Sequence, residues 1–177
     1  MEPWYIATET FTPRHQGWDK YVAWSGLSQL DEVVSLDGIL CRTLLPEIKD
    51  DYWAHIVNED FMLNYFVDLE FLLTQLPQGV ERNLLCVYRN PSSEPVPVGP
   101  VEFGFLGYDL VEGMTRISAL TNCGGFPDVF DNTELSSKGL LTSHARAFEV
   151  RSELKAKYPD DPHADCHVWA ILRAVAS

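Results

Sequence analysis

One stretch decides the fold class. It reads Cys166-His167-Val168-Trp169-Ala170-Ile171-Leu172 and continues to Val175. Val168, Ala170 and Leu172 alternate there with Trp169 and Ile171. Successive side chains of a strand point to opposite faces of the sheet, so a period of two is typical of a strand. The apolar character of both sets predicts that this strand is buried.

A helix is expected immediately before that strand. Ser143 is a suitable N-cap residue, and Pro159 ends the helix after Tyr158. Oppositely charged side chains recur along it at spacings of about one turn, which indicates a solvated face with ion pairs. They are Arg146, Glu149, Glu153 and Lys157.

The other expected elements complete an α+β fold. β-forming residues predict strands over 5–8, 21–24, 83–89, 101–111 and 115–120, with the last two forming a hairpin. Capping signals and helical spacing predict helices over 30–36, 47–57 and 59–76, and a short one from Asn132 or Thr133 to Gly139. We therefore expect residues 1–177 to form a single compact domain, an antiparallel or mixed sheet with helices packed on it.

The stretch 90–100 interrupts this pattern. It holds four prolines, which fix φ and remove backbone donors, so we expect an exposed Pro-rich loop. Its length fits a hairpin excursion within one domain.

Charge is the strongest global property. The chain has 13 lysines and arginines against 26 aspartates and glutamates, a formal net charge of −13. Such a field repels the phosphates of nucleic acids and anionic membrane surfaces, so neither is an expected partner.

The sequence has no long apolar run and no signal-peptide pattern at Met1-Glu2-Pro3-Trp4-Tyr5, so the expected location is the cytoplasm.

The four cysteines are isolated from one another, and no CxxC pair occurs. Cys41 and Cys86 lie in apolar surroundings and are expected to be buried. Cys123 differs because it lies in Asn122-Cys123-Gly124-Gly125, where glycine amides can approach a ligand closely.

Histidines that could activate the Cys123 thiol lie farther along the chain. His144, His163 and His167 are candidate bases, and Asp165 or Asn122 could orient them. The alternative is a tight turn in which Cys123 is buried and unreactive.

No metal or cofactor is expected. A zinc site from Cys123, His163, Cys166 and His167 is disfavoured because adjacent residues of a strand face opposite sides. The acidic run of Asp128, Asp131 and Glu134 lacks the spacing of a calcium loop.

Aromatic residues offer a different kind of site. Trp18 stands between Gly17 and Asp19 in a polar segment, so we expect it at the surface, although an aromatic packed on its own core is an equal alternative. Exposed aromatics among carboxylates such as Asp128 and Asp131 suit a protein-binding patch.

Two hypotheses follow. The first is an acidic protein-binding domain, such as an inhibitor or immunity-type partner that neutralises a basic protein. The second is a small cysteine-dependent enzyme or ligand-binding protein that uses the Cys123 loop. The usual nucleotide-binding and hydrolase signatures are absent from the sequence, which weakly favours the first.

Overall fold

The computed structural model describes residues 2–60, 63–96 and 99–175. Within them, six strands form one antiparallel sheet in the order β2-β3-β1-β4-β6-β5. The strands are β1 (Trp4–Thr8), β2 (Ile56–Asp60), β3 (Leu63–Phe66), β4 (Asn83–Arg89), β5 (Phe103–Glu112) and β6 (Cys166–Ala174). The α-helices are α1 (Trp18–Ser25), α2 (Leu69–Gln75) and α3 (His144–Lys157). Short 3₁₀ helices are η1 (Asp50–Tyr52), η2 (Asn132–Glu134) and η3 (Pro162–Asp165).

The predicted α+β fold is confirmed, and β6 explains the alternating sequence pattern. Val168, Ala170 and Leu172 belong to one core, and Trp169 and Ile171 belong to a second core on the opposite face of the sheet. The first core takes side chains from all three helices, and the second takes them from the extended segment 34–36. Burial on both faces explains why β6 is apolar at every position from Val168 to Leu172.

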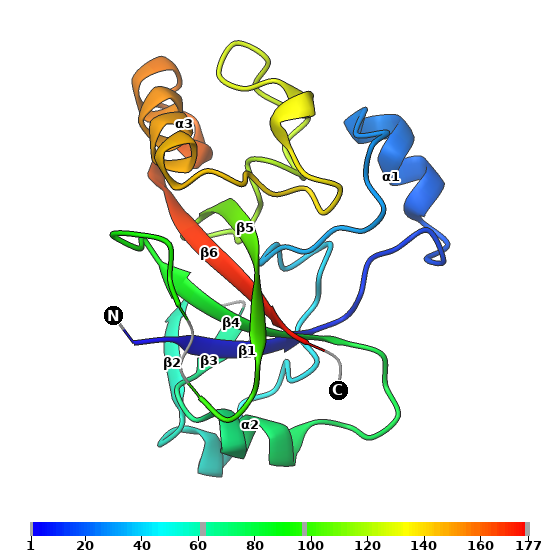
Figure 1. Cartoon of the computed structure of the whole chain (residues 1–177), viewed down its shortest axis with the longest axis vertical. Helices are drawn as coiled ribbons and strands as arrows, with labels where there is room; N and C mark the ends of the chain where they lie inside the picture. The colour runs from blue at the N-terminus through cyan, green and yellow to red at the C-terminus, as the bar shows by residue number, and fades with distance from the viewer. Residues whose placement is uncertain (1, 61–62, 97–98, 176–177) are drawn as a thin grey trace.

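The helices lie at separate places around this sheet. Figure 1 shows α3 beside the start of β6, α1 to one side, and α2 at the opposite end of the molecule from α3. Ser143 caps α3, accepting a hydrogen bond from Arg146 N at 3.3 Å, as the sequence predicts. No helix among the described residues is long and apolar enough to cross a bilayer.

The prediction of a strand over 21–24 is wrong, because these residues lie in α1. Trp18 and Tyr21, one turn apart, face the core, and Gly26 closes the helix in the left-handed conformation. The prediction that Trp18 lies at the surface is also wrong, since only 6% of it is exposed and its ring packs on Phe11.

Residues 30–36 do not form the predicted helix. The backbone amides of residues 31–34 donate to distant segments rather than to the preceding turn. Val33 N donates to Phe11 O, and Val34 N donates to Lys138 O. Val33 to Asp37 are all buried, so an extended segment covers the sheet where an amphipathic helix was expected.

The predicted helices over 47–57 and 59–76 are wrong over most of their length. η1 and β2 occupy the first range, and β2 and β3 occupy the start of the second; Phe61 and Met62 lie outside the described residues. Among the described residues of the second range, only α2 is helical. It begins at Leu69 because Asp68 caps it, accepting a hydrogen bond from Phe71 N at 2.9 Å.

The C-terminal half agrees better with prediction. β4 spans the predicted range, and β5 and α3 differ from theirs by a residue or two. Residues 115–120 form no strand, although Ser118 bridges Val111, and η2 replaces the short helix expected to reach Gly139. β5 therefore pairs with β6 instead of forming the predicted hairpin.

The segment 90–100 links β4 to β5 without regular structure in its described residues. Ser92, Ser93 and Glu94 are exposed, whereas Pro91 is buried. β6 lies between β4 and β5 in the sheet, so the segment crosses that strand and is not a hairpin excursion.

Candidate functional site

The Cys123 loop is a compact turn. Gly124 and Gly125 have φ of 78° and 94°, which glycine adopts without strain. The Cys123 Sγ donates to Ala119 O at 2.7 Å and accepts from Gly125 N at 3.3 Å. Half-burial raises the pKa of the Cys123 thiol to about 11, although the Gly125 N–H opposes the shift. Little thiolate therefore exists at neutral pH, which is unfavourable for a nucleophile.

The residues predicted to act with Cys123 are held by other partners. His163 pairs through Nδ1 with Asp161 at 2.8 Å, and its ring packs against Phe126 at 5.5 Å. Asp165 is exposed and lies 3.9 Å from Lys155. In the described part of the chain, Cys123 forms hydrogen bonds with backbone atoms and not with a histidine, although the Asp161 carboxylate that pairs with His163 is close enough to raise the pKa of the Cys123 thiol.

His167 lies on β6, where its Nδ1 is 3.0 Å from Asn90 Nδ2. Asn90 follows β4 and also contacts Arg151 of α3. This group belongs to a pocket between α3, η3 and β6 that sequence reasoning did not find. No local signal indicated it, since Asn90 and Arg151 are 61 positions apart.

Asn122 takes part in a buried polar network. Its Nδ2 donates to Asp37 Oδ2 at 3.0 Å, and the same oxygen accepts from Ser118 N at 2.9 Å. The other Asp37 oxygen accepts from Ile39 N and Leu40 N. Asn122 therefore fastens the Cys123 loop to the segment 33–41. This hydrogen bond gives the Asn122 side chain a structural role that requires no ligand.

Asp109 is the second buried carboxylate of this network, and none of its surface is exposed. Ser35 and Ser118 donate hydroxyl hydrogen bonds to it, and Leu36 N and Leu110 N donate from the backbone. Burial raises the pKa of Asp109 to about 6, while the two serine hydrogen bonds oppose the shift. The sequence signal was a single aspartate inside the apolar run 108–111.

Asp128 and Asp131 both have internal roles. Asp131 caps η2, accepting from Thr133 N at 2.8 Å, and Glu134 completes the capping box. Asp128 accepts from the Tyr158 hydroxyl, and its carbonyl accepts from Lys157 Nζ. Both aspartates are exposed, but their oxygens are used to fold the segment 126–135.

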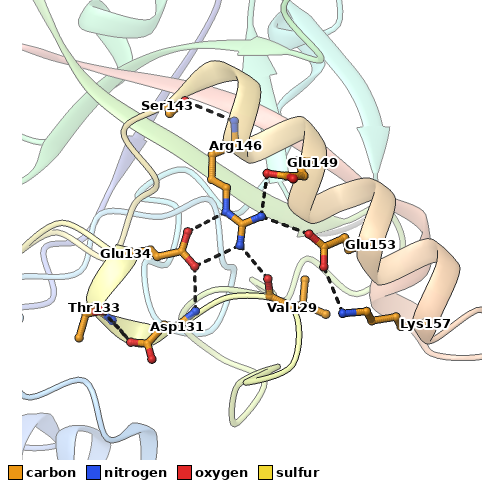
Figure 2. Close-up of polar contacts among 9 residues, drawn as sticks. All are labelled: Val129, Asp131, Thr133, Glu134, Ser143, Arg146, Glu149, Glu153 and Lys157. Carbon is orange, nitrogen blue, oxygen red and sulfur yellow. Dashed lines mark hydrogen bonds and ion pairs between the residues drawn. The ribbon is translucent and has the colours of Figure 1, made fainter.

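Arg146 joins that segment to α3, as Figure 2 shows. Its guanidinium donates to Glu134 Oε2 at 2.7 Å and to Val129 O at 2.8 Å. It also pairs with Glu149 at 2.8 Å and Glu153 at 3.2 Å. The ion pairs predicted for this helix face are therefore present.

Trp53 is an exposed aromatic side chain that sequence reasoning missed, and at 61% it is more exposed than Trp24 of α1, which was also missed. Trp53 follows η1, which packs on α2 through the ring of Tyr52, 5.6 Å from that of Phe71. Val67 and Leu73 of the adjoining segments are also exposed. The same segments of the chain carry exposed carboxylates, namely Glu47, Asp50, Asp51 and Glu70. We call this set of seven residues the Trp53 face.

Comparison with family models, with curated proteins and with solved structures finds no match to this chain. Its function must therefore be argued from its own residues.

Proposed function

We propose that the chain is an acidic protein-binding domain whose Trp53 face docks on a basic protein. The observation that carries this proposal is the exposure of Trp53, together with that of Val67 and Leu73 on the adjoining segments. Tryptophan buries a large apolar area when it enters a partner's pocket, and it is among the residues that contribute most to interface energy.

Charge supports a basic partner. Among the described residues, five cations lie within 3.2 Å of carboxylates of the same chain and so add little positive field: Arg14, Lys138, Arg146, Lys157 and Arg173. On the Trp53 face, in contrast, Asp50, Asp51 and Glu70 have no ion pair among the described contacts. A net charge of −13 accelerates the encounter with a cationic surface.

These features suit an inhibitor or immunity-type partner that covers a cationic site. The aromatic anchor supplies affinity after contact, and the carboxylates steer the approach and select against acidic proteins. The alternative of a cysteine-dependent enzyme has less support, because the raised pKa of Cys123 keeps its thiol protonated.

The test is affinity capture with three forms of the chain: wild type, Trp53→Ala and Trp24→Ala. Trp24 is 56% exposed on α1, so it is a matched control for the loss of an exposed indole. We expect wild type and the Trp24 variant to retain one basic protein and the Trp53 variant to lose it. With that protein purified, calorimetry should give a dissociation constant about 30-fold larger for Trp53→Ala than for wild type.

Replacing Asp50 and Asp51 with asparagine tests the role of charge separately. The association rate of this double variant should be lower than that of wild type. Added salt should also lower the association rate of wild type. Equal affinities for wild type and Trp53→Ala, or a captured protein that is itself acidic, would refute the proposal.

A further inference from the structure

A pocket of about 510 Å³ lies between α3, η3 and the start of β6. Figure 1 shows α3 at the end of the molecule opposite α2, so a pocket lined by α3 lies far from the Trp53 face. Its polar and charged lining comes from Asn90, Arg151, Ser152, Lys155, Asp165 and His167, with the buried Cys166 at the wall. Its volume lies within the range of about 300–1,000 Å³ that small-molecule sites occupy.

The pocket is positive in a strongly negative protein. Arg151 and Lys155 stand one turn apart on α3, so both point to the same side of the helix. Among the described residues that line the pocket, Asp165 is the only carboxylate, and its side chain is 89% exposed and 3.9 Å from that of Lys155. An ion pair this exposed is weak, so an anion that binds Lys155 more tightly can displace Asp165.

Asn90 holds the two sides of the pocket in register. Its Oδ1 accepts from Val168 N at 3.0 Å and from Arg151 Nη1 at 2.9 Å. Its Nδ2 must then donate to Nδ1 of His167, 3.0 Å away, which places the ring proton of His167 on Nε2. Asn90 adopts φ of 47°, a left-handed conformation that asparagine tolerates better than most residues.

Arg151 is oriented but not saturated. Its guanidinium lies over the ring of Phe148 at 4.8 Å, and Asn90 takes one of its five N–H donors. A fixed, planar guanidinium with remaining donors matches the oxygens of a phosphate group, and an ammonium one turn away adds a second charge.

We propose that this pocket binds the phosphate group of a small molecule, with Arg151 and Lys155 as its ligands and Asn90 as the residue that positions Arg151. Two cations balance the two charges of a phosphate near neutral pH, whereas a carboxylate needs only one. This site does not depend on the proposed protein-binding function.

Calorimetric titration of the whole chain with inorganic phosphate tests the proposal, at constant ionic strength and with acetate as the comparison anion. We expect a dissociation constant of about 1 mM for phosphate and at least about tenfold weaker binding of acetate. Lys155→Gln should weaken phosphate binding by about tenfold, and its 73% exposed side chain can be removed without harm to the fold. Arg151→Gln should weaken it further.

Lys20→Gln is the matched control, because it removes one exposed cation of α1 and should leave phosphate binding unchanged. Glycerol phosphate distinguishes the source of the group: tighter binding than inorganic phosphate assigns an organic phosphate, and equal binding assigns the free ion. The proposal is overturned if millimolar phosphate gives no saturable binding. It is also overturned if Lys155→Gln binds like wild type, or if Lys20→Gln weakens binding equally.

Discussion

Asp109→Asn should change how the stability of this protein depends on pH. The carboxyl is fully buried, and burial raises its pKa to about 6 from an ordinary value of 3.8. A raised folded-state pKa means that the folded state binds the proton more tightly than the unfolded chain does. The stabilisation from Asp109 is therefore complete below about pH 3.8 and is lost as the pH rises through about 6.

The magnitude follows from these two pKa values. Between about pH 7 and about pH 5, proton linkage at Asp109 should add about 1 kcal/mol to the free energy of unfolding. Asparagine cannot titrate, so the variant lacks this gain. Its amide group also meets backbone donors from Leu36 and Leu110, where the carboxylate only accepts, and that mismatch costs about 1–3 kcal/mol at every pH.

Urea unfolding of both proteins at several pH values measures the difference. Other titrating groups are common to the two chains and cancel when the free energies of unfolding are subtracted. The pH dependence of this difference therefore reports Asp109 alone. Asp19→Asn, which removes an exposed carboxylate, controls for the change in net charge. A difference between wild type and Asp109→Asn that stays constant from about pH 5 to about pH 7 would refute the reasoning. Direct NMR titration of the Asp109 carboxyl in wild type gives a second reading that does not require the variant to fold.

Two further predictions concern stability, one through packing at Gly107 and one through the ion pairs of Arg146. Gly107→Ala should lower the free energy of unfolding, measured by thermal unfolding, by about 2–4 kcal/mol, because φ is 147° at this bulge of β5 and an added Cβ would lie 2.6 Å from Leu141 O. Gly104→Ala on the same strand is the control. Its added Cβ would lie 3.7 Å from the nearest atom, so the free energy of unfolding should change by less than about 1 kcal/mol. Arg146→Met should cost about 1–2 kcal/mol and speed proteolysis within 126–135, since its guanidinium joins that segment to α3. The exposed ion pair of Arg14 should contribute less than about 1 kcal/mol when removed in the same way, and similar losses for the two arginines would contradict this assignment.

The candidate sites show which signals local sequence carries. The glycines after Cys123 correctly indicated a turn, but the turn places Cys123 against backbone atoms rather than against a base. Trp18 was expected at the surface because its neighbours are polar, yet α1 turns it toward Phe11. Trp53 is exposed because η1 presents it outside the contact that Tyr52 makes with α2. Exposure of a tryptophan thus depends on the orientation of its element, which neighbouring residues do not determine.

The amino-acid sequence alone determined the α+β class, the buried strand β6, the capped helix α3 with its ion pairs, and the acidic surface. All of these arise from local periodicity, local capping or total charge, which act between residues close in the chain or sum over it. Only the tertiary structure decided that β6 lies between β4 and β5, that residues 30–36 are extended, and that Asn90 meets His167 across 77 positions. Strand order and such distant contacts depend on which apolar faces bury one another, and short-range patterns leave that choice open.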